Sequence, residues 1–160
     1  MDRINRIVSH PLWREAVQDI RELEKDRIFC GHTVSHFMDV ARLAEIENLR
    51  EGLGISREMI YTAALLHDIG RAMQYRQGSP HHIAGGQLAE KILPDCGFSA
   101  GETDEIVEAI TRHRAKETGE DRELSGLLYR ADKASRLCLF CEAQAECNWS
   151  DEKKNLLLKD

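Results

Sequence analysis

Apolar residues recur at intervals of three and four along most of this chain, and they rarely alternate with polar residues. This spacing puts apolar side chains on one face of an α-helix, whereas a half-buried strand needs alternation at every second residue. Residues 12–23 and 106–110 are clear examples. The small numbers of prolines and aromatic residues also differ from the composition of a β-sandwich with its many turns. The sequence therefore predicts an all-α protein, a bundle of six to seven helices.

Length and charge limit the architecture and the partners. A chain of 160 residues with 42% hydrophobic residues is long enough for one packed core, so we predict a single domain over residues 1–160. Its core is expected over about 28–140, with a cysteine-containing extension over 141–160. The net charge of −6 argues against a nucleic-acid polymer or an anionic membrane as partner. Without an apolar run near the length of about 20 residues that spans a bilayer, we expect a cytoplasmic protein. The oligomeric state stays open.

Capping residues and glycines mark the expected helix ends. One helix should run from Arg57 to Asp68, and the next stretch, 71–78, should be a connection that starts as a helix. The last main helix should begin near Leu124, with an apolar side that reaches Leu137. Ser150 is expected to cap a short terminal helix that ends at residues 156–158.

His67 and Asp68 stand side by side directly after an apolar helical run. A buried Asp is costly unless a cation lies against it, and a neutral His beside it offers only a lone pair. A metal ion would satisfy both side chains. The alternative is a helix cap with a solvated side chain.

Other His and Asp residues fall at inward-facing or terminal positions of four further helices. Any one of these histidines could instead be a core residue bonded to a carbonyl, and His82 is the alternative to His81. Five helices that each present such a residue nevertheless favour a metal site between them. Nitrogen and carboxylate ligands suit Fe, Mn, Zn, Co, Ni or Mg, with one ion or two, and Asp68 would bridge a pair. The candidate ligands are His36, His67, Asp68, His81, His113 and Asp132.

These residues resemble the HD-domain superfamily of metal-dependent phosphohydrolases over roughly residues 28–140. Residues 36–41 are similar to the first motif, Leu66-His67-Asp68-Ile69-Gly70-Arg71 to the second and Ala131-Asp132-Lys133 to the last. His81 and residues 109–113 resemble the binuclear subgroup, which includes HD-GYP phosphodiesterases and dinucleoside-tetraphosphate hydrolases. The GYP sequence is missing, which argues against cleavage of cyclic dinucleotides. Residues 129–155 resemble a small bacterial subset of the superfamily.

The ligand set and the resemblance imply hydrolysis of a phosphate ester or anhydride by metal-activated water, in a nucleotide or similar small phosphorylated substrate. The expected catalytic residues are Asp68, His32, Arg71 and Lys133. His32 should face the substrate, and the two cations should lie near the phosphoryl group. Arg136 is a further candidate cation, or a surface charge. The alternative functions are an HD-fold di-iron oxygenase and a non-enzymatic sensor of metal or nucleotide.

The cysteines form a second candidate site. Cys138, Cys141 and Cys147 follow a C-x2-C-x5-C spacing, and Cys30, which precedes the helix of His36, is the preferred fourth ligand, with Cys96 as the other option. Structural zinc and an iron–sulfur cluster both fit this spacing. The alternative is a set of ordinary reduced thiols.

Overall fold

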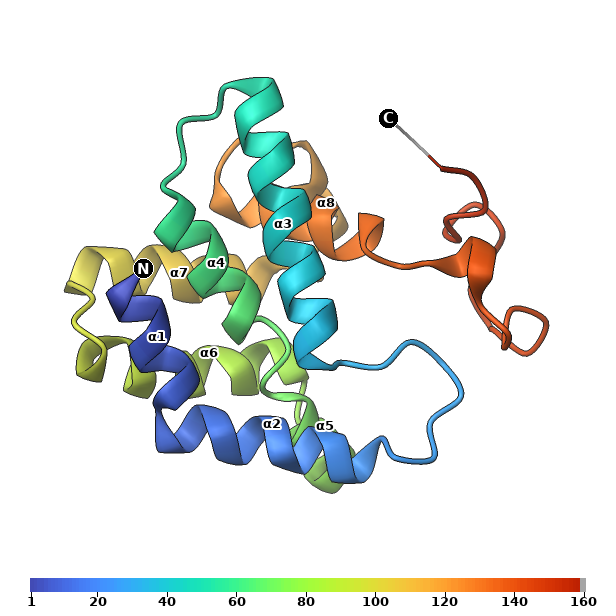
Figure 1. Cartoon of the computed structure of the whole chain (residues 1–160), viewed down its shortest axis with the longest axis horizontal. Coiled ribbons are helices and arrows are strands. Elements are labelled where there is room, and N and C mark those ends of the chain that lie inside the picture. The colour runs from blue at the N-terminus through green and yellow to red at the C-terminus, as the bar shows by residue number, and fades with distance from the viewer. Residues whose placement is uncertain (159–160) are drawn as a thin grey trace.

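A computed structural model describes residues 1–158, and that part of the chain contains eight α-helices, two short 3-10 helices and no strand (Figure 1). The elements are α1 (Asp2–Ser9), α2 (Pro11–Leu23), α3 (Val34–Glu51), α4 (Arg57–Leu66), α5 (Arg71–Gln77), α6 (His81–Asp95), α7 (Ala100–Arg112), η1 (Lys116–Glu120), α8 (Leu124–Ala134) and η2 (Cys138–Phe140). The predicted all-α, single-domain fold is confirmed. The connection expected over 71–78 is the helix α5.

The core lies between α3, α4, α7 and α8. Helix α3 packs on both α4 and α8, and α7 packs on α4, α6 and α8, while α1 and α2 cover one side (Figure 1). Phe37, Leu66, Ile110 and Leu127 are fully buried in it. None of the helices in residues 1–158 is long and apolar enough to cross a membrane.

The chain beyond α8 differs from the expected helices. Helix α8 stops at Ala134, where the Ser135 hydroxyl donates to the Asp132 carbonyl at 2.7 Å and the Asn155 amide donates to the Lys133 carbonyl at 2.7 Å. These side chains satisfy carbonyls that a longer helix would use. Leu137, expected on the apolar side, is 66% exposed.

The predicted terminal helix after Ser150 is wrong, because the chain makes only a turn there. The N–H groups of Lys153 and Lys154 donate to the Ser150 carbonyl, and no helix follows within the described residues. Leu157 and Leu158, which would have formed its apolar face, are exposed. A short helix without a packed face is not stable in water.

Gly70 allows the turn after α4 to lie directly on the first turn of α6. A Cβ atom at this position would be 2.1 Å from the His81 carbonyl oxygen and 2.5 Å from the Gly85 nitrogen. Any side chain would therefore push the two segments apart. The close approach brings His81, the first residue of α6, up to the His67-Asp68 turn.

Candidate metal centre

The six candidate ligands all come from helix ends. His36 is in the first turn of α3, where the Thr33 hydroxyl accepts from the His36 N–H as the N-cap. Asp132 lies in the last turn of α8. His81 is the first residue of α6, and His113 follows directly after α7. His67 and Asp68 lie in the turn after α4. Five helix ends therefore meet at one buried point.

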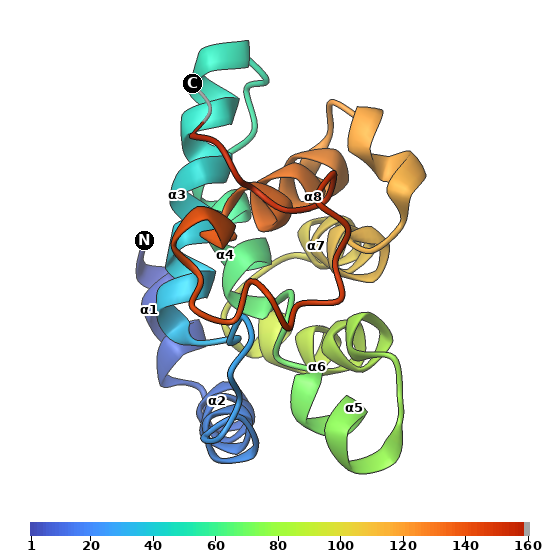
Figure 2. The same ribbon diagram turned by 90° about the vertical axis from the view of Figure 1, so that its right-hand side faces the viewer.

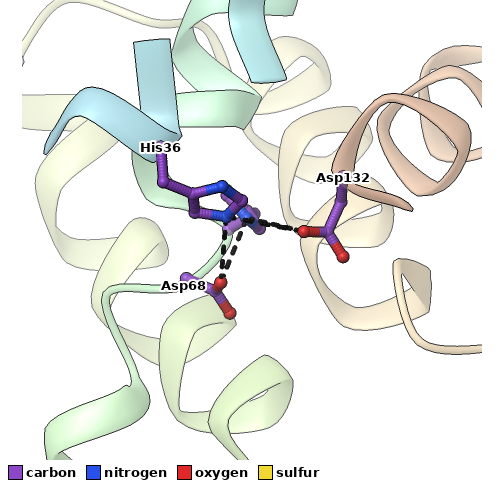
Figure 3. Close-up of side chains that lie close together, drawn as sticks. His36, Asp68 and Asp132 are labelled. Atoms are coloured by element: carbon purple, nitrogen blue, oxygen red, sulfur yellow. Dashed lines mark ion pairs between the residues drawn. The ribbon is translucent and has the colours of Figure 1, made fainter. Parts of the chain in front are cut away.

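The first group contains His36, His67, Asp68 and Asp132, with ligand atoms within 4.8 Å of one another. The His36 Nε2 atom lies 3.6 Å from Asp68 Oδ2 and 3.5 Å from Asp132 Oδ1, and Figure 3 shows both carboxylates beside the His36 ring. The His67 Nε2 atom lies 3.2 Å from Asp68 Oδ2 and 3.8 Å from Asp132 Oδ1. Two imidazoles and two carboxylates thus surround one small space.

The second group contains Asp68, His81 and His113. The Asp68 Oδ1 atom lies 3.3 Å from His81 Nε2 and 3.8 Å from His113 Nε2, and the two Nε2 atoms are 3.3 Å apart. The two oxygens of Asp68 therefore face different groups, Oδ2 the first and Oδ1 the second. Asp68 thus offers one candidate ligand oxygen to each group.

Each of the four histidines has its Nδ1 atom occupied by a hydrogen-bond acceptor outside the site. His67 and His113 donate to the carbonyls of Ala64 and Ile110 at 2.7 and 2.5 Å. His81 donates to Gln74 Oε1 at 2.7 Å, and His36 Nδ1 lies 3.3 Å from the Ser135 hydroxyl. With Nδ1 turned to these partners, Nε2 is the atom of each ring that is directed at the centre, as in metal-ligating histidines.

The buried centre contains polar atoms that no other atom of residues 1–158 satisfies. His67 and Asp68 are completely buried, yet His67 Nε2 and Asp68 Oδ2 have no hydrogen-bond partner. Burial lowers the pKa of His81 to about 2 and of His113 to about 3, so both are neutral near pH 7. Orphaned polar atoms of this kind are costly, and a cation satisfies them. The His and Asp groups are compatible with divalent metal ions.

The two carboxylates favour positive charge in the same place. Burial alone would lower the pKa of His67, but the charge of Asp68, together with Asp132, raises it to about 9. Burial opposes ionisation of Asp68, yet the neighbouring His67 and His36 keep the pKa of its carboxyl well below the usual range.

Three cations border the centre. Arg71 Nε donates to Asp68 Oδ1 at 3.0 Å, and Lys133 Nζ donates to Asp132 Oδ2 at 2.6 Å. Arg136 Nη2 lies 2.9 Å from Asp132 Oδ1 and 3.3 Å from His36 Nε2. Arg136 is only 8% exposed, so it is no surface charge, and its guanidinium reaches into the first group.

His32 lies beside the first group, and a residue outside that group fixes the orientation of its ring. Glu24 accepts hydrogen bonds from both the backbone N–H and the Nδ1 atom of His32. His32 Nε2 then faces Asp68 Oδ2 at 3.7 Å. Burial opposes ionisation of Glu24, but hydrogen bonds from His32 and Tyr75 lower its pKa to about 2. Glu24 is therefore an anion that fixes the His32 ring.

A cavity of about 450 Å³ opens beside the centre, and His32 and Asp132 line its wall. Basic side chains outnumber acidic ones there by six to two, in a chain whose net charge is −6. The cations are Arg27, Arg71, Arg114, Lys133, Arg136 and Lys154. An anionic ligand would be attracted to this cavity.

The four cysteines of the second candidate site line this same cavity, namely Cys30, Cys138, Cys141 and Cys147. All are free thiols. Cys96, the other option for a fourth ligand, is buried in the helical core and does not line the cavity.

The sequence did not identify the residues that orient the candidate ligands and His32 through hydrogen bonds. Gln74, Ser135 and Glu24 act only through contacts between segments far apart in the chain or around a helix end. No motif marks them. For Arg136 there was a signal, its position one helical turn after Asp132.

Comparisons with known proteins agree on the family. The HD domain family matches residues 33–143. A crystal structure of a predicted HD superfamily hydrolase from an uncultured Thermotogales bacterium is 28% identical, with a TM-score of 0.62 over 88% of this chain and 80% of that one. The chain belongs to the HD-domain family, which is part of a superfamily of metal-dependent hydrolases.

Two relatives differ in how much of their length is shared. An uncharacterized protein of Clostridium beijerinckii is 44% identical over 155 residues, which are 97% of each chain. A ribonuclease Y of Oleidesulfovibrio alaskensis is 29% identical over 126 residues, which are 79% of this chain but only 22% of that protein. This chain thus spans about a fifth of that ribonuclease.

Proposed function

We propose that this protein is a metal-dependent phosphohydrolase that cleaves a phosphate ester or anhydride in a nucleotide or similar small substrate. The observation that carries the proposal is Asp68, whose two carboxylate oxygens face two separate groups of imidazoles. His36, His67 and Asp132 would complete one metal position, and His81 and His113 the other. Bound divalent ions supply water of lowered pKa and polarise a phosphoryl oxygen.

The basic cavity would hold the phosphate group. Arg71 and Lys133 border both the centre and the cavity, and each also neutralises a candidate ligand carboxylate. Cations near the developing charge of a phosphoryl transition state lower the barrier, and removing one such group costs about 100-fold or more in rate. Arg114, exposed at the cavity wall, is free to contact a distal part of the substrate.

His32 would take the proton from the attacking water. Because Glu24 accepts from Nδ1, the Nε2 lone pair is directed toward the centre and can accept that proton. The arrangement is a His oriented by a buried carboxylate, which stabilises the imidazolium as it forms. Glu24 would thus act as a positioning residue.

We infer the class of bond that is cleaved, a phosphate ester or anhydride, from the chemistry of the site and from the relatives. The ribonuclease Y relatives carry the name of an enzyme that acts on RNA, whose linkages are phosphodiesters. For this chain, the cavity volume of about 450 Å³ suits a single nucleotide or a dinucleotide. We therefore propose a small phosphoester, rather than a nucleic-acid polymer, as the substrate.

The experiment is a substrate screen on metal-free protein to which single divalent ions are returned. The panel contains nucleoside phosphates, linear and cyclic dinucleotides, short oligoribonucleotides and a generic phosphoester. We expect turnover of at least one member that disappears in Asp68→Ala, while Asp104→Ala, an exposed Asp on α7, keeps it. A fully active, correctly folded Asp68→Ala protein would contradict the proposed site. Turnover of no member with any ion would contradict the proposed activity.

A further inference from the structure

The segment 135–158 and the connection 24–33 are two irregular parts of the chain with little core of their own. Between Leu137 and Leu158, only Cys138 and Ala143 are buried apolar residues, while Phe140 is 68% exposed. In the connection, Ile28 is 63% exposed. Segments that bury so little apolar surface usually need a covalent or metal crosslink to stay ordered.

These two segments meet at the cavity beside the metal centre and bring four of the five cysteines to it. Cys30 comes from the connection, and Cys138, Cys141 and Cys147 come from the C-terminal segment. Figure 2 shows the C-terminal segment, in red, crossing the front of the molecule beside the connection that leads into α3. The fifth cysteine, Cys96, belongs to the helical core.

Hydrogen bonds fix the backbone around these thiols. The Gln144 amide donates to the Cys138 carbonyl at 2.8 Å, and the Cys141 N–H donates to the same carbonyl at 3.1 Å. On the other side, Arg27 Nε donates to the Cys30 carbonyl at 2.9 Å. These hydrogen bonds fix the backbone at Cys30, Cys138 and Cys141 beside the cavity that all four cysteines line.

Basic residues line the same cavity as the four cysteines, among them Arg27, Arg136 and Lys154. Cysteine binds metal as the thiolate, and positive charge nearby offsets the negative charge of such a site.

A tetrahedral zinc site needs its sulfur atoms closer together than an iron–sulfur cluster does. Tetrahedral zinc with Zn–S bonds of about 2.3 Å holds its thiolates about 3.8 Å apart. Within residues 1–158, no three cysteine sulfurs lie within 4.8 Å of one another. An iron–sulfur cluster puts an inorganic core between its four cysteines and so takes a wider set. We propose that Cys30, Cys138, Cys141 and Cys147 ligate an iron–sulfur cluster that fixes the C-terminal segment beside the metal centre.

The test is anaerobic purification of the full chain, followed by reconstitution with ferrous iron and sulfide. The readouts are acid-labile sulfide per chain and visible absorption. We expect both signals in the wild type, complete loss of them in Cys141→Ser and in Cys147→Ser, and retention in Cys96→Ser as the matched control. Asp68→Ala should keep the labile sulfide, because the His and Asp site contributes none. Circular dichroism checks that each variant folds.

Three results would overturn the proposal. One is zinc bound at one ion per chain, lost in Cys141→Ser and never accompanied by labile sulfide. Another is the same sulfide content in Cys147→Ser as in the wild type. The third is no labile sulfide after reconstitution. Sulfide content is independent of phosphoester turnover, so this proposal and the proposed hydrolase activity fail separately.

Discussion

Two polar networks connect helices of this protein, and they differ in whether all of their charged and polar atoms have partners. At the outer edge, Arg3 of α1 contacts Glu58 of α4 at 2.7 Å and Glu102 of α7 at 2.9 Å. Its Nε, Nη1 and Nη2 atoms all donate to these carboxylates. At the centre, His67 and Asp68 are fully buried and keep atoms without a hydrogen-bond partner.

The difference separates a structural network from a binding site. The Arg3 network needs nothing from outside, because each charge has an opposite charge against it. The His and Asp centre also has cations against its carboxylates, namely Arg71, Lys133 and Arg136. It nevertheless keeps His67 Nε2 and Asp68 Oδ2 without a hydrogen-bond partner among the described residues, and a metal ion would satisfy both. The following predictions test the centre first and the Arg3 network last.

The largest effect is expected from Gly70→Ala. The new methyl group would overlap the His81 carbonyl and the Gly85 nitrogen, so α6 must shift away from the turn of Asp68. We expect a loss of roughly 3 kcal/mol in the free energy of unfolding, from overpacking against backbone, together with loss of the second metal position. Urea unfolding and metal titration measure the two effects.

Gly101→Ala is the matched control for this change. A Cβ atom on Gly101, in the first turn of α7, would meet nothing within 4 Å. Stability should be unchanged or slightly higher, since alanine favours the helix. If Gly70→Ala is as stable as Gly101→Ala and binds the same number of ions, the close approach of α6 does not hold the centre together.

Gln74→Ala should have an intermediate effect that is confined to one half of the centre. Gln74 accepts from His81 Nδ1, and without it the ring loses the partner that fixes its tautomer and orientation. Such outer partners are worth about 10–100-fold in metal affinity or activity. Calorimetric titration should show one of two binding steps weakened by this factor, and the other step unchanged. Equal weakening of both steps would mean that the two groups are not separate positions.

The smallest effect is expected from Glu102→Gln, in the Arg3 network. The hydrogen bond from Arg3, with those from Ser99, lowers the pKa of Glu102 from 4.5 to about 2. A carboxyl with a lowered pKa adds stability above its unfolded value, and this stability is lost as pH falls from about 4.5 toward 2. The variant should therefore lose less stability than the wild type over this range.

Glutamine can still serve the capping box with Ser99, so the change tests the charge alone. Urea unfolding of metal-free protein at several pH values measures it, and added salt should reduce the difference. Identical pH profiles for variant and wild type would show that the Arg3 network contributes no charge-dependent stability.

The fold and the candidate ligands could be predicted from sequence because both depend on local patterns. The helical spacing of apolar residues gave the all-α class, and His36, His67 and Asp132 belong to short motifs. The contact between Gly70 and α6, and the hydrogen bonds from His32 to Glu24, could not be predicted, because each depends on how the chain turns between two helices and not on helical spacing. The chain after α8 was predicted poorly, since several of its large apolar residues, among them Leu137, Phe140 and Leu158, are exposed and form no helical face.

The cavity beside the centre has walls of a different kind from the centre itself. The candidate ligands stand on helix ends, whereas several residues of the wall, including Arg27 and Trp149, come from irregular segments. Irregular segments tolerate substitution and changes of length far better than packed helices do. Substitutions in residues 24–33 and 135–158 that spare Glu24, His32, Ser135 and Arg136 would therefore alter the walls of the cavity and leave the candidate ligands in place.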